Sequence, residues 1–185
     1  MSEKRPALAE FIDGLVTYHI PRYAELPDLP LYMDQVVVLM ERYLAPLAPG
    51  EEKPVTPAMI NNYVKQGVIP APVNKKYEKR HLAYLVVVFI LKQVLSISEI
   101  RDVIEQETQD GEIYTLYDGF CADQEDSFHA AAEIMKESRG QMSDEKLALQ
   151  LAMSACAQRT AVAQLMKKPE MQHQEKKKEK KEKDK

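Results

Sequence analysis

Residues 56–67 read TPAMINNYVKQG, and this stretch decides how the chain divides into helices and turns. Threonine followed by proline is typical of a helix start, because the Thr hydroxyl caps free N–H groups and proline needs no donor in the first turn. Gly67 indicates the end of the same helix, since glycine readily adopts the left-handed conformation of a C-terminal cap. We therefore predict a short helix over residues 56–66.

The predicted helix has two faces of different character. Helical spacing places Ile60, Tyr63 and Val64 together on an apolar face. The other face is polar and contains no acid: Ala58, Asn61, Asn62 and Lys65. Asparagine can bind adenine through two hydrogen bonds and lysine can bind guanine or phosphate, so the polar face is typical of a helix that reads the DNA major groove. A solvent-facing helix without DNA would explain the same residues.

The positions of the prolines indicate where short elements and long helices lie in the rest of the chain. Ten of the eleven prolines lie at or before Pro72, which predicts short elements there and permits long helices over residues 73–168. Apolar periodicity, caps and glycines then predict further helices over residues 7–19, 31–44, 79–94, from 97 onward, 112–138 and 143–167.

Two of these segments carry additional signals. Residues 79–94 are almost wholly apolar, which predicts a central buried helix. Ser96 and Glu99 have the spacing of a capping box at the start of the next helix. Residues 68–78 hold two prolines and Asn74, which favours a hairpin or wing-like loop. The fold class is therefore all-α, mainly helical, with a short β-hairpin wing.

Charge is distributed unevenly along the chain. The net charge is −4, yet residues 53–92 carry seven basic groups and one acid, whereas residues 93–135 carry one basic group and eleven acids. A compact basic region in an acidic protein favours a polyanionic partner that binds only there. The expected phosphate-contacting residues lie in or near the wing 74–80 and at the helix start: Thr56, Lys75, Lys76, Tyr77, Lys79 and Arg80.

The sequence also resembles two known families. Residues 61–72 (NNYVKQGVIPAP), 75–77 (KKY) and 95–100 (LSISEI) resemble the N-terminal domain of mercury-resistance-type (MerR-like) transcription regulators, with the order and spacing of that domain over roughly residues 33–106. Residues 26–28 (LPD), 31–36 (LYMDQV) and 59–63 (MINNY) closely resemble an uncharacterised bacterial family, domain of unknown function 1836, over about residues 10–110.

The MerR-like resemblance implies a winged helix-turn-helix domain, and it implies roles for individual residues. Base reading would belong to Asn61, Asn62 and Lys65, and Tyr63 would lie in the core-side turn. Two features depart from the regulators. The loop at about residues 45–55 is longer than their tight turn, and residues 112–138 lack a sustained heptad repeat, so the geometry of a dimer stays open.

The expected organisation has four parts. Residues 1–30 form an N-terminal helix and Pro-rich linker, and residues 31–110 form the MerR-like domain. Residues 111–168 form a helical hairpin that either caps the domain or forms a dimer interface. Residues 169–185 form a disordered Lys-rich tail.

Several function classes find no support. No Gly-rich phosphate loop, His-Glu-x-x-His or Cys-x-x-Cys motif occurs, so we expect no enzyme, cofactor or metal site. Two cysteines and no apolar run of about 18 residues predict a cytoplasmic protein without membrane contact. The expected function is a sequence-specific regulator of transcription that binds double-stranded DNA as a homodimer, with a small-molecule effector left open. The alternatives are a helical protein-interaction module, or a ligand or metal sensor that uses the C-terminal helices.

Overall fold

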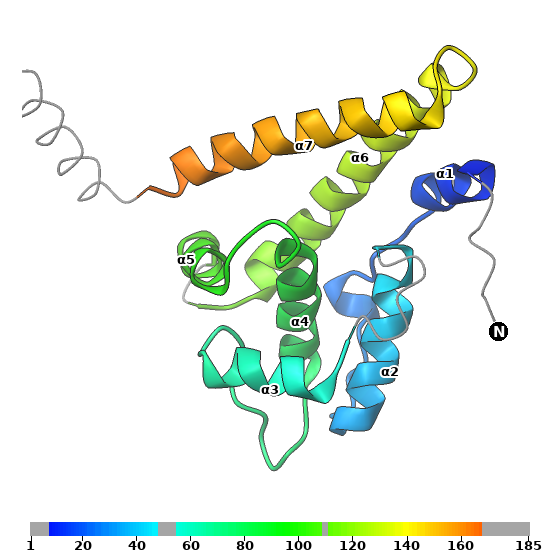
Figure 1. Ribbon diagram of the computed structural model, residues 1–185. Coiled ribbons are helices and arrows are strands. Elements are labelled where there is room, and N and C mark those ends of the chain that lie inside the picture. Colours follow the sequence, from blue (N-terminus) through cyan, green and yellow to red (C-terminus); the bar gives the residue numbers. More distant parts are fainter. Residues whose placement is uncertain (1–7, 48–54, 109–110, 168–185) are drawn as a thin grey trace, which may run out of the picture. The chain divides into compact units, whose positions relative to one another are not determined.

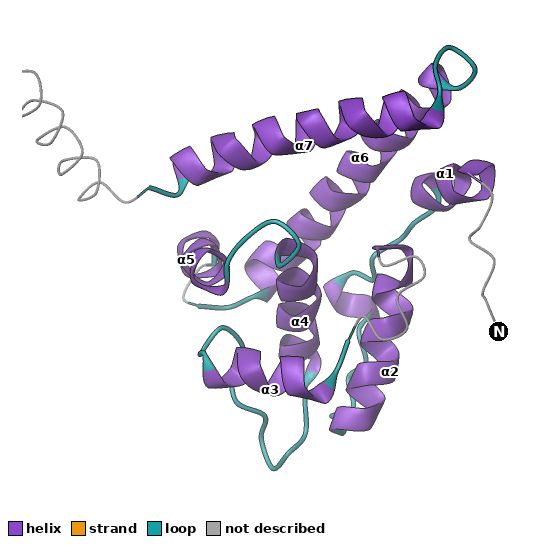
Figure 2. Cartoon of the chain, in the orientation of Figure 1, coloured by secondary structure: helices purple, strands orange, loops and turns teal. Residues whose placement is uncertain are grey.

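A computed structural model describes residues 8–47, 55–108 and 111–167 (Figure 1). The chain divides into two compact units, Met1–Glu137 and Ser138–Lys185, and each is described by itself. Helices make up nearly all of the regular structure in the described residues (Figure 2): α1 (Leu8–Val16), η1 (Tyr23–Glu25), α2 (Met33–Leu44), η2 (Ala45–Leu47), α3 (Pro57–Lys65), α4 (Lys79–Leu91), α5 (Ile97–Glu107), α6 (Tyr114–Ser138) and α7 (Asp144–Leu165). The mainly helical prediction is therefore confirmed.

Helix α4 lies at the centre of the first unit. Its side chains from His81 to Ile90 are buried, apart from the half-buried Tyr84. Helix α2 packs against it and contributes Val36, Met40 and Leu44 to the core. Each buried aliphatic side chain stabilises the fold by about 1.5–3 kcal/mol relative to an exposed one. The apolar run that predicted a buried helix thus forms the core of this unit.

Helix α3 begins and ends at the predicted residues. The Thr56 hydroxyl accepts a hydrogen bond from the Met59 N–H at 3.3 Å, and Pro57 occupies the first turn. Gly67 has a φ of +70° directly after the helix, the left-handed conformation expected of the C-terminal cap. The buried Tyr63 packs edge-on against Phe89 of α4, with ring centroids 5.4 Å apart. Local caps therefore set the length of α3, and one aromatic contact sets the face that it buries.

Helix α5 confirms the predicted capping box. The Ser96 hydroxyl accepts from the Glu99 N–H at 3.3 Å, and the Glu99 carboxylate accepts from the Ser96 N–H at 2.7 Å. Ile100 and Ile104 are the buried residues of this helix.

The predicted β-hairpin wing is not formed by strands. Among the described residues the segment contains isolated bridges only, between Val73 and Lys76 and between Leu31 and Tyr77. The next hydrogen-bonded pair of a longer ladder would be Ala71 and Glu78. His81 takes up both groups, since its Nδ1 accepts from the Glu78 N–H and its Nε2 bonds the Ala71 carbonyl, so one pair of residues closes a tight turn and no ladder extends from it.

Helix α1 packs on α6 through a small apolar cluster. Ile12, Leu15 and Ala132 are buried in it, and Phe128 is among the partly buried residues that surround them. The ring of Tyr18, which follows α1, meets Phe128 edge-on at 5.6 Å. This cluster holds the N-terminal helix against the second half of α6.

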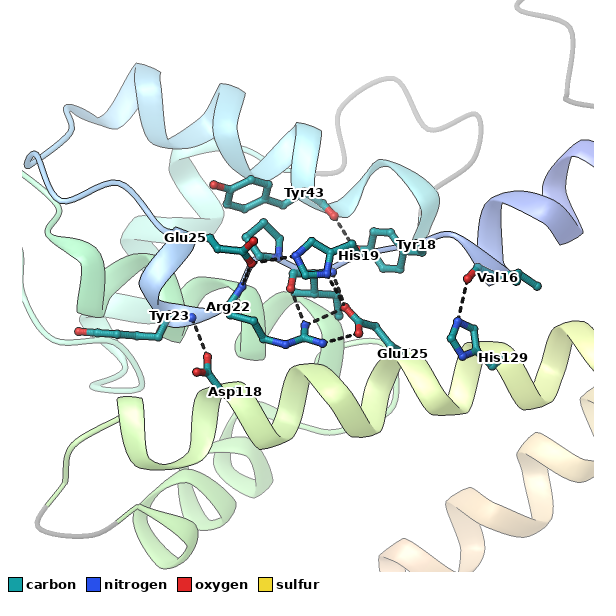
Figure 3. Close-up of polar contacts among 12 residues, drawn as sticks. Val16, Tyr18, His19, Arg22, Tyr23, Glu25, Tyr43, Asp118, Glu125 and His129 are labelled. Carbon is teal, nitrogen blue, oxygen red and sulfur yellow. Dashed lines mark hydrogen bonds and ion pairs between the residues drawn. The ribbon is translucent and has the colours of Figure 1, made fainter.

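A polar network fastens the segment after α1 to α6 (Figure 3). The Glu125 carboxylate accepts from the Ile20 N–H at 2.7 Å and from the Arg22 guanidinium at 2.8 and 2.5 Å. Asp118 accepts from the Tyr23 N–H at 2.6 Å, and the buried Tyr117 donates to the Pro21 carbonyl at 2.9 Å. The acids of α6 therefore satisfy backbone donors of a segment about 100 residues away.

The second unit contains α7. The Ser143 hydroxyl caps this helix by accepting from the Lys146 N–H, and Gly140 has a φ of +80° in the preceding turn. Leu147 is its buried residue, whereas Leu149, Met153 and Leu165 are exposed. The two long helices predicted over residues 112–138 and 143–167 are thus present, while the predicted Lys-rich tail lies outside the described residues.

A membrane-spanning helix would need both length and sustained hydropathy, and no helix among the described residues combines the two.

Replacing Glu125 with Gln tests the polar network. Arg22 and the Ile20 N–H hold the pKa of Glu125 down, from 4.5 to about 2. The folded protein thus keeps this carboxylate charged where the unfolded chain protonates it, so its contribution is present above pH 4.5 and is lost as the pH falls toward 2. We expect Glu125→Gln to lower the free energy of unfolding by about 2 kcal/mol at pH 7.

Urea denaturation at several pH values measures this difference. The difference in free energy of unfolding between the unaltered protein and Glu125→Gln should shrink below pH 4.5. The control Asp126→Asn changes an exposed neighbouring acid and should have little effect on stability. Equal stabilities of Glu125→Gln and Asp126→Asn at pH 7 would contradict the role assigned to Glu125.

Candidate nucleic-acid interface

The outward face of α3 carries the three residues predicted to read bases. Asn61, Asn62 and Lys65 are all exposed, whereas Ile60 and Tyr63 on the same helix are buried. No acid occurs anywhere in Pro57–Lys65. The structure therefore brings the predicted base-reading residues together on one solvent-facing surface of positive charge.

A tight turn follows α3 and carries the predicted wing lysines. The Val73 N–H donates to the Lys76 carbonyl at 3.1 Å, and the Lys76 N–H donates to the Val73 carbonyl at 2.9 Å. Asn74 and Lys75 between them have φ values of 51° and 61°. Two successive left-handed residues define a type I′ turn, which places the exposed Lys75 at its tip.

Backbone bonds and a buried aromatic pair anchor this turn. Leu31 and Tyr77 exchange two backbone hydrogen bonds of 2.8 Å, which ties the turn to the start of α2. The Tyr77 ring is buried and meets the ring of His81 edge-on at 5.8 Å. A buried ring does not favour the phosphate contact predicted for Tyr77, and the residue serves to hold the turn.

His81 connects the turn to α4. Its Nδ1 accepts from the Glu78 N–H at 2.9 Å, so Nε2 carries the proton and donates to the Ala71 carbonyl at 3.2 Å. Burial lowers the pKa of His81, and the neighbouring Arg80 lowers it further against opposing effects of Ala71 and Glu78. The ring is therefore neutral at pH 7, and both its nitrogens hold backbone groups at the base of the turn.

The basic groups beyond the turn differ in their availability. The Lys79 ammonium lies 2.5 Å from Asp28, with only 18% of its side chain exposed, and also lies over the Tyr23 ring. Arg80 pairs with Glu78 at 3.3 Å. Lys65 and Lys75 form no ion pair with any described residue. An anion would find Lys65 and Lys75 unneutralised, whereas Lys79 already has its counterion.

Lys76 and Thr56 were also predicted to contact phosphates, and the structure places them differently. Lys76 lies over the ring of Tyr32, 5.1 Å from its centroid, which leaves the ammonium beside a polarisable surface. The hydroxyl of Thr56 is half-buried and acts as the helix cap, which does not favour a phosphate contact by that side chain. Tyr32 was missed in the sequence because nothing local links it to residue 76, which lies 44 positions further along.

The polar residues considered for metal binding do not converge. No group of three or more His, Cys, Asp or Glu side chains able to hold an ion occurs within the described ranges. Cys121 is fully buried in α6, and burial raises the pKa of its thiol to about 11. Cys156 is exposed on α7, in the other unit.

A cleft of about 360 Å³ lies beside the C-terminal end of α3. Val64, Val68 and Ile104 line it, and Arg101 and Glu105, 3.9 Å apart, border it. A molecule bound in this cleft would contact the last turn of α3.

Comparison with known proteins assigns a family to the central part of the chain. The model of the family described as Domain of unknown function (DUF1836) matches residues 21–120, which include η1 to α5 and the start of α6. Neither a curated protein nor a solved structure matches the chain.

Replacing Lys75 with Gly tests the geometry of the turn without reference to any ligand. Lysine is strained at a φ of +61°, and Asn-Gly is the preferred pair for a type I′ turn. We expect Lys75→Gly to raise the free energy of unfolding by about 0.5–1 kcal/mol, measured by urea denaturation. The control Lys65→Gly, in the last turn of α3, should lower it, and a loss of stability in Lys75→Gly would contradict the left-handed turn.

Proposed function

The chain belongs to the DUF1836 family, whose function is unknown, and from its own geometry we propose that it is a sequence-specific DNA-binding regulator of transcription. In this proposal α3 enters the major groove as the recognition helix of a MerR-like winged helix-turn-helix domain. The turn at residues 73–76 takes the place of the wing and contacts phosphates. The regulator acts in the cytoplasm as a homodimer.

The acid-free outward face of α3 is the observation that carries the proposal. An α-helix fits the major groove, and Asn side chains can bind the N6 and N7 edge of adenine through two hydrogen bonds. Asn61 and Asn62 are exposed on α3, and Lys65 adds an unneutralised cation on the same face. The small Ala58 would allow close approach at the start of the helix.

The rigidity of this face supports the same function. Base reading requires side chains that are positioned before binding, because ordering them afterwards costs free energy. The Thr56 cap, the left-handed Gly67 and the contact of Tyr63 with Phe89 hold α3 at both ends and along its buried face.

The turn supplies the contacts that position a protein on DNA without reading sequence. Lys75 lies at its tip, Lys76 follows as one of the two residues that close it, and Leu31 and His81 anchor its base. The phosphate contacts in this proposal rest chiefly on Lys75 and Lys76, with Arg80 nearby, because Tyr77 is buried and Lys79 pairs with Asp28. The acidic residues 93–135 would repel the duplex elsewhere, which confines binding to this side of the protein.

Reversing the two turn lysines should weaken binding to every DNA sequence. In Lys75→Glu/Lys76→Glu we expect the slope of log K against log salt to become shallower by about one unit for each phosphate that is no longer neutralised. Fluorescence anisotropy at several salt concentrations measures the slope for one operator and one unrelated duplex. The matched control Lys136→Glu/Lys146→Glu reverses two lysines on α6 and α7 and should leave the slope unchanged. Equal slopes in all three proteins would contradict the role of the turn.

Truncating Asn61 should instead erode specificity. A contact through two hydrogen bonds contributes about 1–3 kcal/mol of discrimination between bases. Selection of genomic fragments with the full chain, followed by affinity measurements on the enriched sequence and its point variants, should show a loss of preference at one base pair in Asn61→Ala. A uniform loss on all sequences would contradict base reading by Asn61. No enrichment of any fragment by the unaltered protein would overturn the DNA-binding proposal and favour the protein-interaction alternative.

A further inference from the structure

An apolar groove of about 410 Å³ runs along α2. Two adjacent rows of side chains, each with a spacing of four residues, form its walls. Leu31, Gln35 and Leu39 form one row, and Asp34, Val38 and Arg42 form the other. Val38 is 59% exposed, although it is a β-branched apolar residue in the middle of the helix. An apolar surface along α2 is therefore open to solvent.

Rows with a spacing of four residues are the ridges that most commonly interdigitate when two helices pack. When such a ridge lies in a groove between two such ridges, the helix axes cross at about −50°. A second α2 has the same ridge, Asp34, Val38 and Arg42, and the same groove beside it. The surface is thus complementary in shape to its own copy.

The charges on the ridge are complementary in the same way. Asp34 and Arg42 lie four residues on either side of Val38, about 6 Å along the axis in each direction. A twofold axis beside Val38 would place Asp34 of each copy opposite Arg42 of the other. Neither side chain forms an ion pair within the part of the chain that the structure describes, so both are available to a partner.

We propose that this face of α2 binds the α2 of a second copy of the chain, in an antiparallel arrangement in which Val38 of each copy lies beside the twofold axis, in the groove of the other copy. An unrelated partner would need the same apolar ridge with opposite charges at its ends, whereas the chain itself already supplies both. The proposed dimer does not depend on DNA binding and can be measured without DNA. It places self-association on α2, whereas the sequence pattern left open a dimer interface at residues 111–168.

The helix dipole would by itself favour charges of these signs at the two ends of α2. An acid in the first turn and a base in the last turn are favourable on any helix, whichever face they occupy. The dipole does not account for their placement on one ridge, symmetrically about an exposed valine. A single helix crossing buries little area, so we expect a weak dimer.

Sedimentation equilibrium of the full chain over a wide concentration range tests the proposal. The unaltered protein should dimerise, and Val38→Glu should be monomeric throughout, with unchanged helical circular dichroism because Val38 is exposed. Asp34→Arg and Arg42→Asp should each weaken the dimer at least tenfold, because each variant places like charges opposite one another. An unaltered protein that stays monomeric at millimolar concentration would overturn the proposal.

Charge exchange supplies the decisive comparison. The double variant Asp34→Arg/Arg42→Asp should recover most of the dimer, although its charges oppose the helix dipole. A matched reversal on α5, Arg101→Asp, should leave dimerisation unchanged. No recovery in the double variant would overturn the antiparallel arrangement, and a dimer insensitive to all the α2 variants would place the interface elsewhere.

A cross-link provides an independent readout of the axis. With the exposed Cys156 replaced by Ser, Val38→Cys should form an intermolecular disulfide under mild oxidation, since the two residues 38 face each other across the axis. The same replacement at exposed Val94, in the connection between α4 and α5, should cross-link far less. Equal cross-linking at both positions would overturn the placement of the axis. Absence of DNA binding with an intact dimer would contradict only the function proposed above. A missing dimer with retained DNA binding would contradict this inference and the homodimer of the proposed function, but not its DNA binding.

Discussion

Burial of α4 is the constraint on which the rest of the first unit depends. A helix that is apolar on nearly all sides cannot be covered by one neighbour, so several elements have to pack around it. Helix α2 covers part of it, and Tyr63 of α3 reaches Phe89 on it. His81, in the first turn of α4, holds the preceding turn through Ala71. The direction in which α3 and the basic turn face the solvent thus follows from the way in which α4 is enclosed.

Acidic and basic residues have different roles in two parts of the chain. The acids of α6 that look like a solvated surface in the sequence include Glu125 and Asp118, which satisfy backbone N–H groups of the segment at residues 20–23. Ile20 is fully buried, and leaving its N–H without a partner would cost about 1–3 kcal/mol. The basic residues on α3 and at the tip of the turn are largely free of acidic neighbours. The acids of α6 thus form hydrogen bonds within the protein, whereas the bases face the solvent. This distribution is compatible with a protein that binds a polyanion on one side only.

The two proposed surfaces would bind their partners through different interactions. The α3 face and the turn combine exposed polar groups with a rigid backbone, which suits recognition by hydrogen bonds and charge. The groove on α2 combines apolar ridges with one charge at each end, which suits association of two identical helices. Both surfaces meet at Leu31, whose backbone pairs with Tyr77 and whose side chain lines the groove. The proposed dimer through α2 would therefore relate the turn and α3 of one copy to those of the other by the twofold axis.

The sequence by itself determined the features that depend on interactions within about four residues. The Thr56 and Ser96 caps, the left-handed Gly67 and the exposed face of α3 were all predictable, because each is decided by local hydrogen bonds or by helical periodicity. The predicted ends of two helices were wrong: α1 ends at Val16 rather than at residue 19, and α4 ends at Leu91 rather than at residue 94. Tertiary structure decided the rest. It buried Tyr77, paired Lys79 with Asp28, placed Lys76 over Tyr32, and left a single-bridge turn where a hairpin was expected. These contacts join residues far apart in the chain, and no local pattern records which distant side chain will occupy the space beside a given lysine or tyrosine once α4 has been enclosed.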